Sequence, residues 1–356
     1  MTVPNLKKLT LWYQVSSASY LGPVRFRTLW QKLGDDIGRI FGMADAQLLE
    51  LKGAVTKQNL LGIREQADQY NASREFMQKQ MDMAAQCGGQ ILTLDDPCYP
   101  QFLRKSKMCH AVIYCIGNLH PFVNYAKAVA VVGTRKAHSD SLRLAEGVAE
   151  KLARQGWVIV SGMAKGIDSA AHEGALKARG KTIAVLGCGP DVIYPSEART
   201  LHSQIRERGL VLSEFPFGTK PEDWKLQKRN KTTVALSTAI FVVETGAKGG
   251  TMNAVRAAAE QTKPVFTVIP SWPGDFSGNQ KAVHNGAVLL DTRDAAQCIA
   301  TRVQSESARL VAVAREKKNH KCTDSHPESD GKRKKNIDHK QRGHASDGGA
   351  CEFTKH

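Results

Sequence analysis

The sequence predicts an α/β protein built around a doubly wound, mostly parallel sheet. Between residues 128 and about 300, short apolar runs alternate with segments of helical character. The runs are apolar at successive positions, as expected for strands that are buried on both faces. Glycine-rich turns follow most of the runs. This alternation is typical of βαβ units, which join parallel strands.

The expected elements follow one another in order along this region. The strands are Ala128–Val132, Trp157–Val160, Thr182–Leu186, Leu210–Leu212, Ile240–Val243 and Pro264–Ile269. The helices between them are Ser141–Arg154, Asp168–Ala178, Glu197–Arg208 and Thr251–Gln261. Two short strands, Ile91–Leu94 and Val112–Tyr114, precede the series. We therefore expect a Rossmann-like sheet with helices on both faces.

The first 88 residues have a helical pattern. Leu29, Trp30 and Leu33 recur at helical spacing. The Gly22-Pro23 pair before them has the form of a helix–hairpin–helix turn, in which the backbone and a helix N-terminus can approach a phosphate. An ordinary turn in a small helical bundle explains these residues equally well. We expect a small helical domain of helix-hairpin-helix or SAM-like type.

The last part of the chain loses its apolar residues. A final helical stretch is expected from Asp294 to about Arg315, and basic runs such as Gly331–Lys335 follow it. Such a composition buries too little apolar surface to fold alone. The expected division is therefore a helical N-terminal domain at 1–88, a Rossmann-like domain at 89–300, and a terminal helix with a disordered basic tail at 301–356.

Charge and composition narrow the class of partner. Fifty Lys and Arg residues against 34 Asp and Glu residues give a formal net charge of +16, which attracts polyanions and makes nucleic acid the first expectation. No apolar run approaches the roughly 20 residues that a membrane span needs. The N-terminus resembles no secretory signal, so we expect a cytoplasmic protein. Its eight cysteines form no C-x-x-C pair, and we expect reduced thiols.

The residues at the carboxyl ends of the expected strands favour the binding of phosphates. Glycines admit an anion to the backbone, helix N-termini carry partial positive charge, and hydroxyl and basic side chains add donors. A tight βα connection is the plain alternative for any one loop, but several such loops share one sheet edge. The candidate binding residues are Gly133, Arg135, Ser161, Gly162, Lys165, Gly166, Lys228, Arg229, Asn230, Lys231, Lys248, Gly250 and Thr251.

Nucleotide cofactors are not expected at this edge. A dinucleotide fold requires G-x-G-x-x-G after the first strand and an acidic residue after the second. Here the first strand is followed by Gly133-Thr134-Arg135 and the second by Ser161-Gly162. A P-loop motif, G-x-x-x-x-G-K-[ST], is absent, and Gly246–Thr251 resembles it only loosely.

Catalytic and metal-binding sets are also not expected. Asp168 and His172 lie one helical turn apart and could form an acid–base pair, but we expect Asp168 to cap its helix and His172 to pack against it. Glu244 follows a strand without an evident partner. His320, Cys322 and His326 in the tail match no established zinc spacing.

The ordered set of motifs resembles the DprA/Smf family over most of residues 10–290. The most specific match is Val160–His172, which has the form SG-x-A-x-GID-x-x-AH. Further matches are Leu94-Asp95 with Tyr99-Pro100, Val131–Arg135, Thr182–Gly189 with Tyr194-Pro195, Ser213–Pro216 and Arg229–Lys231.

The resemblance implies a protein that binds single-stranded DNA during natural transformation and helps to load a RecA-type recombinase. It also implies a homodimer with no cofactor. The family's DNA contacts correspond to Arg135, the loop from Ser161-Gly162 to Gly166, and Arg229–Lys231.

Several positions depart from the family pattern. Lys231 replaces an arginine and lacks its bidentate fork. Leu226-Gln227-Lys228 replaces the aromatic-Pro start of the Arg229–Lys231 motif, so the aromatic residue that could stack on a base is absent there. Gly249–Val255 lacks two hydroxyl residues of the pattern, and a basic tail stands where many members carry a winged helix.

A nucleotide-binding protein or an enzyme is the alternative function. Lysine-decarboxylase-like (LOG) nucleotide phosphoribohydrolases have a similar domain and the motif PGG-x-GT-x-x-E with a catalytic glutamate. In this chain Gly249-Gly250-Thr251 is followed by Met252-Asn253-Ala254, so that glutamate is absent.

Overall fold

The computed structural model describes residues 5–305 of the 356-residue chain. The predicted tail and the histidines and cysteine within it lie outside this range. Helices α1 (Leu6–Ser16), α2 (Pro23–Leu33), α3 (Asp45–Leu49), α4 (Lys57–Ala67) and α5 (Tyr70–Cys87) come first, with one 3-10 helix at Ile37–Gly42. The predicted helical character of the N-terminal part is thus confirmed.

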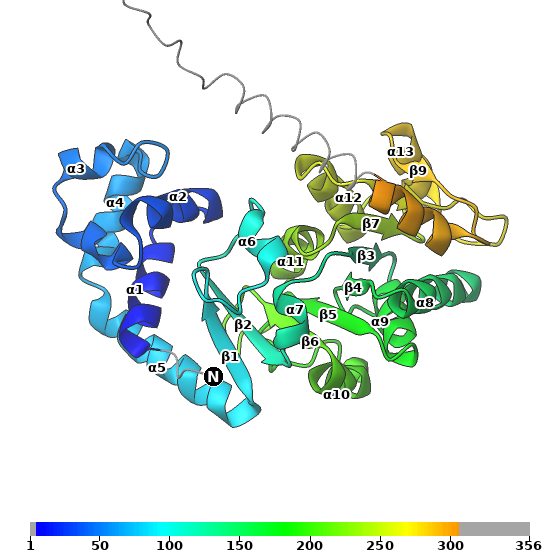
Figure 1. Ribbon diagram of the computed structural model, residues 1–356, viewed down its shortest axis with the longest axis horizontal. Coiled ribbons are helices and arrows are strands. Elements are labelled where there is room, and N and C mark those ends of the chain that lie inside the picture. Colours follow the sequence, from blue (N-terminus) through cyan, green and yellow to red (C-terminus); the bar gives the residue numbers. More distant parts are fainter. Residues whose placement is uncertain (1–4, 306–356) are drawn as a thin grey trace, which may run out of the picture. The chain divides into compact units, whose positions relative to one another are not determined.

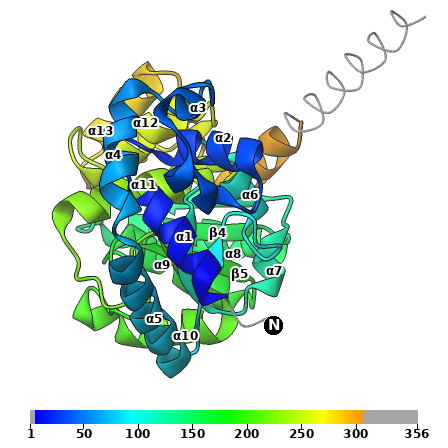
Figure 2. The same ribbon diagram turned by 90° about the vertical axis from the view of Figure 1, so that its left-hand side faces the viewer.

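Helices α1 and α5 lie side by side in this part (Figure 2). Tyr13 of α1 stacks on Phe76 of α5 with ring centroids 4.6 Å apart. Trp12, the residue before Tyr13 in α1, is fully buried and packs against Phe26 of α2. The apolar residues at helical spacing therefore form the core that holds these helices together.

The remaining elements form a nine-stranded sheet with helices on both faces (Figure 1). The strands are β1 (Gly89–Thr93), β2 (Val112–Gly117), β3 (Ala128–Val132), β4 (Val158–Ser161), β5 (Lys181–Leu186), β6 (Leu210–Ser213), β7 (Ala239–Val242), β8 (Val265–Thr267) and β9 (Val288–Leu289). The longer helices among them are α8 (Ser139–Arg154), α9 (Ile167–Lys177), α10 (Arg199–Arg208), α11 (Asp223–Ala235), α12 (Gly250–Glu260) and α13 (Ser277–His284). Short helices α6 (Gln101–Lys105) and α7 (His120–Val123), and a 3-10 turn at Ser196–Ala198, complete the set.

The strand order is β1-β2-β6-β5-β4-β3-β7-β8-β9. Strands β3 to β9 pair in parallel, whereas β2 is antiparallel to both β1 and β6. The predicted doubly wound, mostly parallel sheet is confirmed. The chain leaves β3 toward β4 on one side and returns to pair β7 on the other, so the order reverses between β3 and β7.

Alternate residues of β3 enter two different cores. Val129 and Val131 face a cluster that includes Ala145 and Leu152 of α8. Ala130 and Val132 face a second cluster, which includes Met252 of α12. Both faces of the strand are therefore covered, which explains its continuous apolar sequence.

Two features of the sheet region were not predicted. Helix α11 occupies Asp223–Ala235, where the sequence was interpreted only as a basic cluster, and α13 and β9 extend the far edge. Within residues 5–305, no helix has the length and apolar character that a membrane crossing requires.

Candidate functional site

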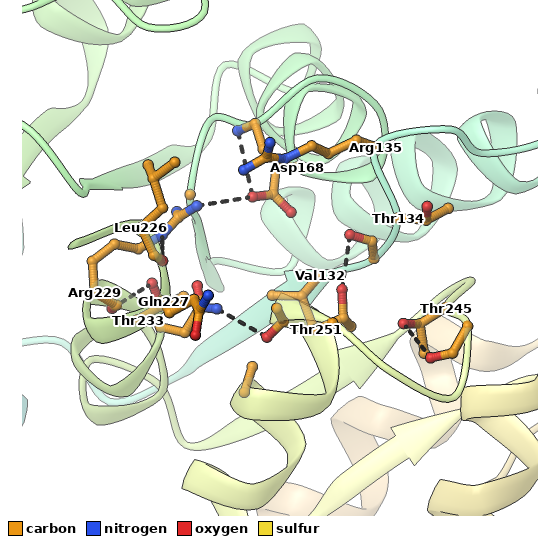
Figure 3. Close-up of a pocket in the computed structure, with 18 of the residues that line it drawn as sticks. Val132, Thr134, Arg135, Asp168, Leu226, Gln227, Arg229, Thr233, Thr245 and Thr251 are labelled. Atoms are coloured by element: carbon orange, nitrogen blue, oxygen red, sulfur yellow. Dashed lines mark hydrogen bonds and ion pairs between the residues drawn. The ribbon is translucent and has the colours of Figure 1, made fainter. Parts of the chain in front are cut away.

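A cleft of about 400 Å³ opens at the carboxyl ends of the central strands (Figure 3). Its walls are the loops after β3 and β7, the first turn of α12, and one side of α11. Because the strand order reverses between β3 and β7, the cleft lies at the position where doubly wound sheets bind their ligands.

The structure brings eight of the thirteen candidate binding residues to the walls of this cleft. They are Gly133, Arg135, Gly162, Arg229, Asn230, Lys248, Gly250 and Thr251. The other five, Ser161, Lys165, Gly166, Lys228 and Lys231, do not line it. Lys136 and Gln227 also line the cleft and were not among the candidates.

Three cations of the cleft carry no salt bridge. Arg135, Lys136 and Lys248 are exposed, and within residues 5–305 no carboxylate lies within 4.0 Å of their charged atoms. Glu244, the carboxylate that follows β7, is not a partner of Arg135. The Glu244 side chain is buried and accepts the backbone N–H of His138 at 3.0 Å. The Arg135 guanidinium is therefore free to meet a phosphate.

The first turn of α12 is open to the cleft. Gly249 precedes the helix with φ 117°, a conformation that favours glycine, and no side chain caps the helix. A Cβ on Gly250 would meet nothing nearer than the Asn230 side-chain nitrogen at 3.6 Å. The hydroxyl of Thr251 is not free for a ligand, since it donates to the Gly133 carbonyl at 3.0 Å. The helix offers backbone N–H groups to an anion instead.

Arg229 is held inside the protein. Its side chain is 5% exposed, Nη1 donates to the Val185 carbonyl at 2.9 Å, and Nη2 lies 3.7 Å from the Asp168 carboxylate. Burial lowers the pKa of Arg229, and the nearby Asp168 opposes this shift. The arginine therefore shapes the floor of the cleft and adds positive potential there, while its hydrogen bonds go largely to protein groups.

The structural roles of Ser161 and two glycines differ from the prediction. Ser161 is fully buried and donates to the Val131 carbonyl at 2.6 Å, so its hydroxyl joins β4 to β3. A Cβ on Gly133 would lie 2.4 Å from the side chain of Ile167. Gly166, at φ 91°, lies against the Thr134 carbonyl, 2.5 Å from the position of an added Cβ. The two glycines therefore allow close packing of the loops, and the Ser161 hydroxyl is already engaged by the protein.

Lys228 and Lys231 point away from the cleft because they lie on the outer side of α11. Lys228 Nζ is 2.7 Å from the carboxylate of Glu214, which is 2% exposed. Lys231 Nζ is 3.7 Å from Glu260. Lys165 is exposed on the loop after β4.

Asp168 and His172 do not form the acid–base pair, because the polar groups of both side chains have other partners. Asp168 is the second residue of α9, and its carboxylate accepts the upstream N–H of Ala164 at 3.4 Å. His172 Nδ1 lies 2.6 Å from the Thr182 hydroxyl, which donates to the Ile159 carbonyl. Burial lowers the pKa of His172 to about 3. The ring is neutral at physiological pH and serves packing against β5.

The structure forms no disulfide among the cysteines of the part of the chain that it describes. Cys87, Cys98, Cys109, Cys115, Cys188 and Cys298 are free thiols. No group of three metal-ligating side chains occurs within residues 5–305.

Comparison with known proteins agrees with this architecture. The family model of DNA recombination-mediator protein A matches residues 90–300. Protein Smf of Synechocystis sp. is 33% identical over 285 residues, which cover 78% of this chain and 69% of that protein. DNA processing protein DprA of Streptococcus pneumoniae is 36% identical over 196 residues, which cover 55% of this chain and 68% of that protein.

Two solved structures are similar in fold as well as sequence. The crystal structure of Streptococcus pneumoniae DprA matches with a TM-score of 0.64 and 27% identity, covering 81% of this chain and 95% of that one. Helicobacter pylori DNA processing protein A matches with a TM-score of 0.53 and 28% identity, covering 60% of this chain and 97% of that one. The family model covers more than half of the chain. The chain therefore belongs to the DNA recombination-mediator protein A family, which includes the DprA and Smf proteins.

Proposed function

We propose that the protein binds single-stranded DNA in the cleft at the β3–β7 edge. The observation that carries this proposal is the group of unpaired cations, Arg135, Lys136 and Lys248, around the uncapped first turn of α12. Charged side chains and free backbone N–H groups together suit successive phosphates of a polynucleotide. The Helicobacter pylori relative has a single-stranded DNA binding mode, which supports the same ligand for this chain.

The cleft favours a single strand over a duplex. It is a space of about 400 Å³ between two loops, the first turn of α12 and one side of α11. A duplex reader instead presents an exposed helix or ribbon to a groove. We expect binding without strong sequence preference, since contacts to phosphates position a strand but do not specify its bases.

A role without catalysis is consistent with the contacts of Asp168 and Glu244, whose carboxylates already have partners within the protein. Asp168 faces Arg229, and Glu244 accepts backbone N–H groups from His138 and Asp275. The catalytic glutamate of LOG-type phosphoribohydrolases would follow Thr251 by three residues, where this chain has Ala254. We infer a mediator protein that delivers bound DNA to a RecA-type recombinase and acts as a homodimer in the cytoplasm.

Binding assays with fluorescent oligonucleotides test this function. We expect the protein to bind oligo-dT more tightly than a duplex of equal length. The logarithm of its affinity should fall with the logarithm of salt concentration by about 0.7 per phosphate neutralised. Equal affinity for both forms, or hydrolysis of a nucleoside monophosphate with no DNA binding, would contradict the proposal.

A further inference from the structure

The two sides of the cleft differ in charge. The loops after β3 and β7 carry the unpaired Arg135, Lys136 and Lys248. The α11 side contributes the uncharged Leu226, Gln227, Asn230 and Thr233, together with Asp223 and the buried Arg229. In Figure 3, Leu226, Gln227 and Arg229 lie across the cleft from Thr134 and Thr245. A phosphate backbone is therefore favoured along the loops, and the bases are left to face α11.

An exposed tryptophan stands on α11 next to this uncharged side. Trp224 is 54% exposed and lies between Asp223 and Leu226, which both line the cleft. Trp224, Gln227, Lys228 and Lys231 recur at i, i+3, i+4 and i+7, and all four are exposed, so they share one face of the helix. Gln227 also lines the cleft. Gln227 thus joins this outer face of α11 to the edge of the cleft, and Trp224 lies one turn before it on the same face.

The indole ring is held in place although it is exposed. Its Nε1 donates to the Glu222 carboxylate at 2.7 Å, and its ring meets Phe215 edge to face with centroids 5.8 Å apart. Lys225 Nζ lies 5.5 Å from the ring centroid. A large apolar ring fixed by three neighbours and open to solvent can bind another flat ring with little loss of conformational freedom.

Charge on this face favours a base over a phosphate. Lys225, Lys228 and Lys231 each pair with a carboxylate, namely Glu222, Glu214 and Glu260. The face therefore offers little free positive charge, unlike the loops after β3 and β7. The feature of this face that remains available to a ligand is the exposed apolar ring of Trp224.

We propose that Trp224 is a stacking platform for a nucleobase of the DNA strand that leaves the cleft along α11. This inference rests on the proposed function. It also gives the chain an aromatic residue near the place where Leu226-Gln227 lacks one. Stacking on an aromatic ring is tolerant of sequence, because every base has a π-face.

Three forms of the protein and two ligands test the proposal. Trp224→Ala should weaken oligo-dT binding roughly 5- to 100-fold, which corresponds to loss of one stacked base. Trp224→Phe should keep most of the affinity. An abasic oligonucleotide of equal length, which has the phosphates but no bases, should bind wild type and Trp224→Ala alike. Thermal melts of both variants should match wild type, because the ring is exposed.

Intrinsic fluorescence gives a second readout. Of the five tryptophans in the chain, Trp12 and Trp157 are fully buried, whereas Trp224 is more than half exposed. Oligo-dT should quench the wild-type emission, and this quenching should be lost in Trp224→Phe although that variant still binds.

The outcomes separate the two proposals. In one outcome, wild type binds oligo-dT and Arg135→Ala weakens binding, but Trp224→Ala leaves both affinity and quenching unchanged. This outcome overturns the stacking role of Trp224 and still supports DNA binding in the cleft. An equal loss of affinity on the abasic ligand would also overturn it, because the residue would then act through the backbone. If wild type binds no single-stranded DNA, both proposals fail.

Discussion

The guanidinium of Arg229 occupies the space in which a side chain on Gly162 would lie. A Cβ on Gly162 would fall 1.1 Å from Nη1 and 1.9 Å from Cζ of Arg229. The glycine after β4 thus admits the arginine of α11 to the Val185 carbonyl and to Asp168. This relationship joins two motifs that lie far apart in the sequence, and it fixes α11 as a wall of the cleft.

The first prediction concerns this contact. Gly162→Ala should displace Arg229, leave the buried Asp168 without its partner, and lower the free energy of unfolding by about 3 kcal/mol. Urea denaturation measures the loss. Gly147→Ala in α8 is the matched control, because an added Cβ there meets no atom within 4 Å and should stabilise the helix slightly. A Gly162→Ala protein as stable as wild type would show that the arginine has room to move.

The second prediction concerns pH. Burial lowers the pKa of His172 to about 3, below the unfolded value near 6.5, so the folded state binds fewer protons than the unfolded state. The contribution is present above pH 6.5 and is lost as pH falls toward 3. Between pH 7 and pH 5 it should remove about 2 kcal/mol of stability.

His172→Asn isolates this contribution. The Asn side chain can still donate to the Thr182 hydroxyl but does not titrate, so the variant should be less stable at pH 7 and less sensitive to acid. Denaturation at pH 7, 6 and 5 compares the two proteins. Parallel losses in wild type and variant would mean that His172 does not cause the acid sensitivity.

The third prediction concerns the unpaired lysines. Lys136→Gln and Lys248→Gln should each reduce the slope of log affinity against log salt by about 0.7, because each removes one contact with a phosphate. Lys151→Gln is the control, since Lys151 is exposed in the last turn of α8, which leads away from the cleft edge. An unchanged slope in both cleft variants would place the strand elsewhere.

The strands could be predicted from the sequence because strands that are buried on both faces consist of continuous apolar residues. Strand β3 occupies Ala128–Val132 as predicted, since every residue is apolar and buried. Helix α11 has no comparable apolar pattern. Its buried residues are Arg229, Thr232, Thr233, Val234 and Ala235, so polar side chains take positions that are usually apolar, and the helical period is hidden.

The grouping of the candidate residues was predicted better than the contacts of each side chain. The sequence places Arg135, Lys248 and Gly250 at one sheet edge, and the structure brings them to one cleft. It does not show that Ser161 turns its hydroxyl to the Val131 carbonyl, or that Arg229 turns inward. The direction of a side chain depends on packing across the sheet, which the order of residues along the chain does not record.

The most direct test of the central claim is oligo-dT binding by Arg135→Ala, followed by fluorescence anisotropy beside a thermal melt. Arg135 is exposed and carries no salt bridge among the described residues, so its removal should leave the melting temperature unchanged. The account predicts a loss of about 1–3 kcal/mol in binding free energy on every oligonucleotide sequence, as expected for one charge-assisted contact to a phosphate. A variant that melts early and binds normally would contradict the account.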